Sequence, residues 1–314
     1  MLAFFNSLIP TSEMLSGGAQ IVLESIKNEY PLTVSLPSRG GYVVIKQLQA
    51  NYRFTKTPFK SNHPICIFLN WVVMAVMCCR FVINEDIVTS GDYFCDTLPA
   101  FFLKGKNKWT AYMFHIIPRK RFLSYLIQQF SILLMKHADR VVVCNPLIKD
   151  YLLNRGFKQV LIQEVGIDEE AIKKVKVEEK IYQACFMGRL SPSKGIFDLP
   201  RIWEGMQGKL LVIGGGGFSS DVERFKKLCP KNIILVGHKE GEEKYKLLKQ
   251  SKFFIFPSYE EGLSLTLKEV LACDLPVIAW DLPVYKELYE GKLITVPIGD
   301  IEKFREKVRE LCVS

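Results

Sequence analysis

The stretch FFIFPSYEEGLSLTLKEVLACDLPVI, from Phe253 to Ile278, sets apolar runs on either side of an acidic loop and a helical pattern. It predicts a buried strand at 253–256, a turn, a loop, a helix and a second strand at 276–278. Two carboxylates, Glu261 in the loop and Glu269 in the helix, lie eight positions apart. Ligands bind outside the carboxyl ends of parallel strands. Carboxylates there can accept the hydroxyl groups of a polyol, and backbone N–H groups at a helix start can bind a phosphate. This loop is therefore the first candidate for a sugar-nucleotide site.

The same alternation of strand and helix patterns runs through the rest of the chain. Strands alternating with helices of this length predict parallel sheets with crossover helices. The expected strands are 2–9, 33–36, 42–48, 85–91, 109–114, 139–145, 160–165, 181–187, 210–213, 233–236 and 293–296, and the expected helices are 65–79, 93–103, 122–136, 146–155, 219–228, 242–250 and 301–311, with one more ending at residue 29.

The charge of the chain is divided unevenly between its halves. The net charge is +9 over 314 residues; residues 1–160 contain 18 Lys/Arg and 9 Asp/Glu, whereas residues 161–314 contain 24 of each. This asymmetry predicts two domains, one of which meets a negatively charged surface or ligand. The charged stretch 169–180 is poor in large apolar side chains and is expected to be a linker between an N-terminal domain (1–168) and a C-terminal domain (181–314).

Cysteine usage and hydropathy bear on the cellular compartment. The nine cysteines form no CxxC or Cys/His spacing, so reduced core thiols of a cytosolic protein are favoured over a structural zinc site. The N-terminus lacks the basic lead and cleavage site of a signal peptide. The run 65–83 is the one transmembrane candidate; a buried helix up to Cys79 is favoured, with a membrane span or an interfacial helix as alternatives. We therefore expect a cytoplasmic protein, with peripheral attachment to the inner face of a membrane left open.

A basic segment lies in the N-terminal half, interleaved with aromatic side chains. One interpretation is a solvated surface patch. The other is docking to anionic lipid head groups or to a phosphorylated acceptor. Nucleic acid is not expected as a partner, because no recognised binding motif accompanies the charge. The cations are Lys104, Lys106, Lys108, Arg119, Lys120 and Arg121.

The segment GRLSPSKG (188–195), together with PSYEEGLSLTLKEVLACDLPV (257–277), resembles the C-terminal domain of retaining GT-B glycosyltransferases of the family-four type, glycosyl transferases group 1. The resemblance extends over residues 83–312, and reaches 1–82 only through the pair Gly17-Gly18. It implies an α/β GT-B fold, with two Rossmann-like parallel-sheet domains facing across a cleft. The donor nucleotide would be held mainly by the second domain.

The resemblance also assigns roles in that second domain. Arg189 and Lys194 would clasp the donor diphosphate, whose negative charge grows as it departs. Glu269 would bind the ribose hydroxyls, and Glu261 would face the donor sugar. The backbone of Gly262, Leu263, Ser264 and Leu265 would bring N–H groups toward the sugar and the diphosphate.

Three residues of the first domain complete the expected site. Gly17 and Gly18 match a glycine loop that closes onto the diphosphate, and His115 matches a histidine beside the donor sugar. Taken alone, a two-glycine loop is weak support for phosphate binding, because turns use glycine for positive φ. A histidine at a strand end is, by itself, more often structural.

The implied reaction is hexose transfer from a UDP- or GDP-linked sugar to a lipid-linked or other glycan acceptor. No clear carboxylate nucleophile is implied, so retention would follow front-face attack by the acceptor hydroxyl. The sequence contains no D-x-D pair, and neither a metal nor another cofactor is expected. Alternatives are a nucleotide-sugar epimerase of the same fold and a non-catalytic nucleotide-sugar or membrane-binding protein.

The sequence also departs from the family pattern in two places. The chain ends soon after Leu311, where family members usually continue into a helix that crosses back to the first domain. Asp274 occupies a position where glycine is usual, which predicts a changed turn.

Overall fold

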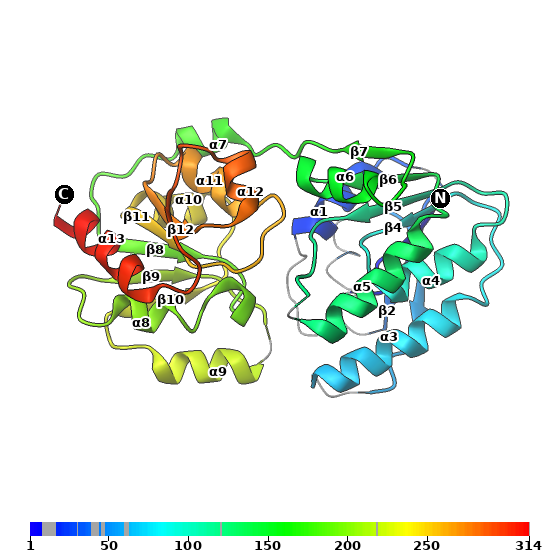
Figure 1. The fold of residues 1–314 in the computed structure, drawn as a ribbon, viewed down its shortest axis with the longest axis horizontal. Helices are drawn as coiled ribbons and strands as arrows, with labels where there is room; N and C mark the ends of the chain where they lie inside the picture. Colours follow the sequence, from blue (N-terminus) through cyan, green and yellow to red (C-terminus); the bar gives the residue numbers. More distant parts are fainter. Residues whose placement is uncertain are drawn as a thin grey trace. The chain divides into compact units, whose positions relative to one another are not determined.

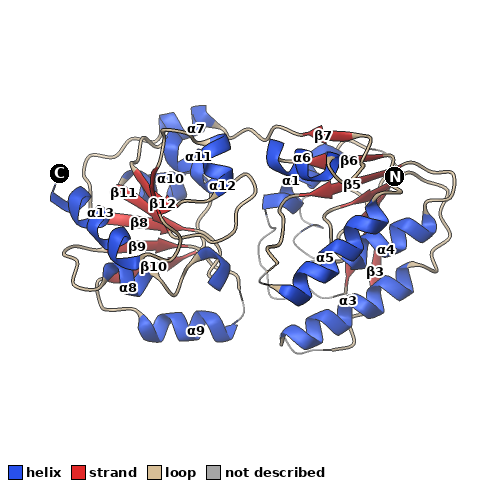
Figure 2. Ribbon diagram, in the orientation of Figure 1, coloured by secondary structure: helices blue, strands red, loops and turns tan. Residues whose placement is uncertain are grey.

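The chain forms two compact units, Met1–Val165 and Gly166–Ser314. Each unit is built on a sheet of parallel strands with helices packed against it (Figures 1 and 2). The computed structural model describes residues 1–7, 17–29, 31–38, 44, 48–59, 63–119, 121–217 and 219–313.

The first unit has a seven-stranded sheet in the order β3-β2-β1-β4-β5-β6-β7. All neighbouring strands are parallel. The chain order reverses between β1 and β4, which is where open sheets of this kind bind ligands. The strands are β1 (Leu2–Phe4), β2 (Thr33–Pro37), β3 (Asn51–Thr55), β4 (Ile87–Thr89), β5 (Trp109–Met113), β6 (Arg140–Val143) and β7 (Val160–Ile162), and the described helices are α1 (Gly17–Ile26), α3 (Pro64–Cys78), α4 (Phe94–Leu103), α5 (Phe122–Met135) and α6 (Pro146–Leu153).

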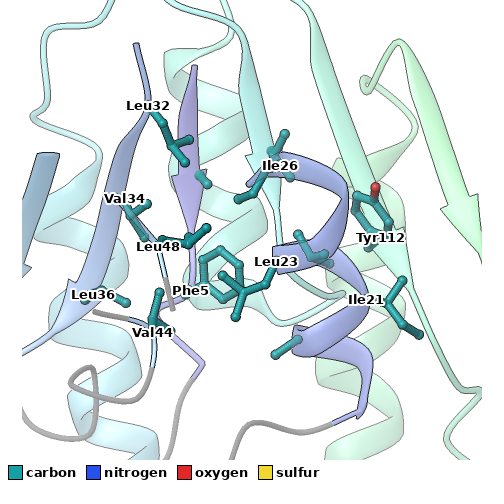
Figure 3. Close-up of a cluster of buried hydrophobic side chains, with 14 of the residues drawn as sticks. Phe5, Ile21, Leu23, Ile26, Leu32, Val34, Leu36, Val44, Leu48 and Tyr112 are labelled. Carbon is teal, nitrogen blue, oxygen red and sulfur yellow. The ribbon is translucent and has the colours of Figure 1, made fainter. Parts of the chain in front are cut away.

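Helices bury both faces of this sheet. On one face, Ile26 of α1 packs in one cluster with Phe5 and with Val34 of β2 (Figure 3). Side chains alternate along a strand, so Ser35 points the other way. Its hydroxyl lies 3.6 Å from the Sγ of Cys78 in α3. Because both faces are covered, most strands are continuous apolar runs, which is the pattern that made them predictable.

The second unit has a six-stranded parallel sheet in the order β10-β9-β8-β11-β12-β13. Its chain order reverses between β8 and β11. The strands are β8 (Tyr182–Met187), β9 (Leu210–Ile213), β10 (Ile233–Gly237), β11 (Ser251–Phe256), β12 (Val277–Trp280) and β13 (Ile294–Val296), and the helices are α7 (Glu169–Lys174), η1 (Pro192–Lys194, a 3-10 turn), α8 (Leu199–Trp203), α9 (Ser219–Leu228), α10 (Gly241–Lys249), α11 (Leu265–Ala272), α12 (Pro283–Leu288) and α13 (Ile301–Val313).

Most predicted elements of both units are present, and strand β3 and helices α7 and α12 are additions. Strand β3 was not predicted because it lies at the sheet edge, where Asn51 and Phe54 are exposed and no apolar run forms. Helix α12 has six residues, too few for a helical period to show. Strand β1 ends at Phe4, short of the predicted span. The strand expected at 42–48 falls mostly outside the described residues.

The stretch for which a linker is expected, 169–180, contains helix α7. Ile172 of this helix is fully buried, and α7 contacts α10 and α11. Lys249 of α10 donates hydrogen bonds of 2.7 Å to the carbonyls of Ile172 and Val175. These contacts attach the first part of the stretch to the second unit.

Helix α3 differs from the expectation of a buried helix. It spans Pro64–Cys78, one residue earlier at each end than predicted, but Ile65, Phe68 and Val76 are among six apolar side chains that it exposes. The buried interpretation is therefore wrong for one face, because only the opposite face packs on the unit. Among the residues that the structure describes, no helix has the length and apolarity to cross a membrane.

Candidate functional site

In the first unit, the glycine pair begins helix α1. Gly17 and Gly18 are the first helical residues, where N–H groups have no partner within the helix; they do not form the loop that was predicted before it. A Cβ on Gly18 would lie 2.5 Å from Cδ2 of Phe114. Any larger residue at this position would have to displace the Phe114 ring. The structure therefore brings Gly18 beside the segment that contains His115.

The position of His115 depends on residues that sequence reasoning missed. Gln128 of α5 is buried and donates to the backbone carbonyl of His115 at 2.9 Å and to Oδ2 of Asp92 at 2.5 Å. Its Oε1 accepts the N–H of Ile117 at 2.8 Å. These bonds fix the chain that follows β5 onto helix α5. The sequence signal that could have identified Gln128 was its position on the apolar face of a predicted helix.

Asp96 is a second missed residue, at the reversal point of the first sheet. It is fully buried in the first turn of α4. Its Oδ1 accepts the N–H of Asn6, just after β1, at 2.8 Å. Burial raises the pKa of Asp96 to about 8, although hydrogen bonds from Asn6, Ser7 and Ser90 oppose the shift. The folded chain therefore holds this carboxyl protonated at neutral pH.

Asp96→Asn is expected to raise the free energy of unfolding relative to wild type, by an amount that increases with pH. Between about pH 4 and about pH 8, Asp96 binds a proton in the folded chain but loses it on unfolding. Wild type therefore loses up to about 1.4 kcal/mol of unfolding free energy for each pH unit in this window. Asparagine keeps the shape without the titration. Thermal unfolding across the window measures the difference, and parallel pH profiles for the two proteins would contradict the protonated state.

In the second unit, two predicted loops meet at the β8/β11 reversal point. The 188–195 loop follows β8, and the 257–264 loop follows β11. Gly195 has φ of +72°, and a Cβ there would lie 1.9 Å from the carbonyl oxygen of Pro257. The N–H of Tyr259 donates to the carbonyl of Ser193 at 2.9 Å, and its hydroxyl donates to Oδ2 of Asp198 at 2.7 Å. The two loops are thus held as one structure.

This junction places Lys194 against Glu261. Lys194 Nζ lies 2.6 Å from Oε1 of Glu261 and donates to the carbonyl of Glu260 at 3.1 Å. The Glu261 side chain is 6% exposed, so its charge is balanced by the ammonium. An ammonium has three N–H donors, and these bonds use two of them. Arg189, at the start of the same loop, is exposed and has no ion-pair partner within the described ranges.

The segment Gly262–Leu265 leads into helix α11. Ser264 has φ of +53°, a conformation that is strained for a residue other than glycine. Its side-chain oxygen caps the helix by accepting the N–H of Leu267 at 3.4 Å. Tyr289 donates to the carbonyls of Leu263 and Ser264 at 2.6 and 3.1 Å. Tyr289 was not predicted, since its only sequence signal is an aromatic residue near a short helix.

Glu269 lies one helical turn further along α11 and is also paired. Its Oε1 lies 2.7 Å from Nζ of Lys244 and 3.3 Å from the hydroxyl of Tyr245, both on α10. Burial alone would lower the pKa of Lys244, but Glu269 outweighs it and raises that pKa. Both of these bonds reach Oε1, and within the described part of the chain Oε2 accepts no hydrogen bond, which leaves it to a ligand hydroxyl group. The partners Lys244 and Tyr245 were missed because they lie on another helix.

Three further features concern the turn at Asp274, the cysteines and possible metal ligands. Asp274 has φ of +58°, the left-handed conformation that a glycine adopts readily. All nine cysteines are free thiols. Within the described residues, no cluster of three or more His, Cys, Asp or Glu side chains could hold a metal ion. Each half of the expected site is described within its own unit.

Comparison with known proteins identifies the second unit. Residues 167–313 match the family description "Glycosyl transferases group 1". Alpha-galactosylglucosyldiacylglycerol synthase of Streptococcus pneumoniae is 24% identical over 192 residues, which are 54% of this chain and 51% of that protein. D-rhamnosyltransferase WbpZ of Pseudomonas aeruginosa is 23% identical over 227 residues, which are 67% of this chain and 60% of that protein. The match thus spans less than two thirds of these relatives.

Solved structures share the whole fold. Anabaena Alr3699/HepE, in complex with UDP and glucose, has a TM-score of 0.73 at 13% identity and covers 100% of this chain and 89% of its own. Sucrose-phosphate synthase from Thermosynechococcus elongatus has a TM-score of 0.69 at 15% identity, with the same coverage. Residues 167–313 thus match the glycosyl transferases group 1 family, and the chain as a whole has the GT-B fold.

Proposed function

We propose that the chain is a retaining glycosyltransferase that moves a hexose from a nucleoside-diphosphate sugar to a lipid-linked or other glycan acceptor. The observation that carries the proposal is the Lys194–Glu261 pair at the β8/β11 reversal point. It sets a cation that keeps one N–H donor unbonded among the described residues beside a carboxylate, where α/β sheets bind ligands. The matched family and the glycolipid synthase among the relatives support the reaction class and the acceptor class.

The proposed donor contacts follow from two ion pairs of the second unit, Lys194–Glu261 and Lys244–Glu269. Lys194 and Arg189 bind the donor diphosphate, and they neutralise the charge that develops on it as the glycosidic bond breaks. Oε2 of Glu269 accepts a ribose hydroxyl, while Lys244 and Tyr245 hold the other oxygen. Glu261 accepts from a sugar hydroxyl. Gly17, Gly18, His115 and the backbone at Gly262–Leu265 contribute the remaining contacts.

Retention is proposed to proceed by front-face attack of the acceptor hydroxyl. Glu261 is already engaged by the Lys194 ammonium at 2.6 Å, which makes it a poor nucleophile. The bond between the anomeric carbon and the diphosphate breaks on the face where the new bond forms, and a departing phosphate oxygen accepts the hydroxyl proton. The departing diphosphate also stabilises the oxocarbenium-like transition state. Diphosphate binding by Arg189 and Lys194 requires no metal in this proposal, and no other cofactor is assigned.

Transfer assays with a panel of donors test the function. The protein is incubated with UDP-glucose, GDP-mannose or UDP-GlcNAc, with and without membrane extract. Nucleotide release together with a labelled glycolipid or glycan is the expected result. Interconversion of the donor sugar without an acceptor would indicate an epimerase. Binding without turnover across the panel would indicate a non-catalytic protein, and either outcome would overturn the proposal.

A further inference from the structure

Helix α3 exposes an apolar stripe and hides its polar residue. Every exposed side chain described in α3 is apolar, and these side chains recur every three or four residues. The one polar amide, on Asn70, is buried and bonds to the backbone of Phe59 at 2.9 and 3.1 Å. A surface helix of a water-soluble unit has the opposite arrangement. The exposed residues are Ile65, Phe68, Leu69, Val72, Val76 and Met77.

Helix α5 repeats this inverted arrangement. Gln128 and Ser131 are buried, whereas each exposed side chain of the helix is apolar. Leu123 and Phe122 are 70% and 69% exposed. The same exposed stripe continues through Leu126, Phe130 and Leu133.

The two stripes form one surface, which we call the α3–α5 face. Phe68 of α3 and Leu126, Ile127 and Phe130 of α5 line a shared hollow of about 280 Å³, with Phe94 of α4 also lining it. Figure 2 shows α3 and α5 on the same side of the first unit. Large contiguous apolar patches on a protein surface mark interaction sites.

The charge around the α3–α5 face identifies its partner. Residues 30–84 contain six Lys/Arg and residues 97–138 contain seven, with no Asp or Glu in either stretch. Exposed cations flank the stripes: Arg80 follows α3, Arg119 and Arg121 precede α5, and Lys136 follows it. Arg119 lies 5.9 Å from the ring of Tyr125 in the first turn of α5. A second copy of the chain would set these cations against one another, whereas an anionic lipid surface would attract them.

We infer that the α3–α5 face docks on an anionic lipid bilayer. Its apolar side chains enter the boundary between head groups and acyl chains, and the flanking cations contact lipid phosphates. Both helices pack lengthwise on the unit, so the face lies along the bilayer surface. The inference extends the lipid-linked acceptor of the proposed function, because it would bring the first unit to the acceptor. Lys120, in the same basic segment, lies outside the described residues.

Vesicle sedimentation tests the docking. Wild type is expected to bind vesicles of phosphatidylcholine with phosphatidylglycerol, and to bind phosphatidylcholine alone much more weakly. Added salt should weaken the first interaction. The double variant Leu123→Gln/Leu133→Gln should bind anionic vesicles at least about tenfold less tightly, because two large apolar side chains lose their burial in lipid. Both residues are exposed, so the melting temperature should stay close to that of wild type.

The matched control is Leu228→Gln/Ile298→Gln, which removes two apolar side chains of the second unit that are each 49% exposed. This control should bind vesicles as wild type does. Equal binding by the α5 variant and wild type, or no binding by wild type, would overturn the inference. So would a wild-type dimer that the α5 variant abolishes without any effect on vesicle binding. Hydrolysis of the donor without lipid reports on the transferase site separately, so the two proposals can fail independently.

Discussion

Lys194→Ala and Arg189→Ala are each expected to lower the kcat of sugar transfer about 100-fold or more. Both cations are proposed to neutralise the charge that builds on the departing diphosphate, and loss of one such donor elsewhere has an effect of this size. The ground-state donor carries much of the same charge, so its KM should rise as well. Initial rates over a range of donor concentrations, with the labelled product quantified, separate kcat from KM.

Removal of Lys194 also has a structural consequence that must be measured separately. Glu261 is 6% exposed and loses its only ion-pair partner within the described residues, which costs stability. The double variant Lys194→Met/Glu261→Gln removes both charges and should recover the melting temperature, but not the rate. Lys226→Ala is the control, because Lys226 pairs with Glu223 on the exposed face of α9. Near-wild-type transfer by both Lys194→Ala and Arg189→Ala would overturn the diphosphate assignment.

Glu269→Gln is expected to weaken donor binding about tenfold to 100-fold. Hydrogen bonds from hydroxyl groups to a charged acceptor contribute about 1.5–3 kcal/mol, and the amide loses that charge. The ribose lies far from the reacting bond, so the contact is made equally in the ground and transition states. The KM of the donor should therefore rise more than kcat falls. Calorimetric titration with UDP and with its 2′-deoxy analogue measures the contact directly.

The deoxy analogue distinguishes ribose binding from a purely structural role. Wild type should bind UDP more tightly than 2′-deoxy-UDP, and Glu269→Gln should bind both with nearly equal affinity. Lys244→Met removes the partner of Glu269 but keeps the carboxylate, so it should retain discrimination between the two nucleotides. If Glu269→Gln discriminates as wild type does, Glu269 only anchors α11 to α10. Glu223→Gln, on the surface of α9, is the neutral control.

Much of the fold could be predicted because the sheets are covered on both faces. Buried parallel strands appear as apolar runs between turn residues, and β9 and α9 have the predicted bounds. Strand β3 could not be predicted, because an edge strand is half-exposed and its sequence carries little apolar signal. Helix α3 could be predicted as a helix. Its exposed apolar face could not be predicted, because a helix that is apolar all round does not show which face is covered.

The sequence alone determined the two-sheet class, the division of charge between the halves and the residue types of the candidate site. It also placed Glu261 after one strand and Lys194 after another. Only the tertiary structure decided that these two residues pair. They lie 67 residues apart in the sequence, and they meet because β8 and β11 are neighbouring strands of the sheet. The same holds for Lys244 and Glu269, which lie on two helices. Local patterns report which elements form, but the order of strands in a sheet is set by long-range packing.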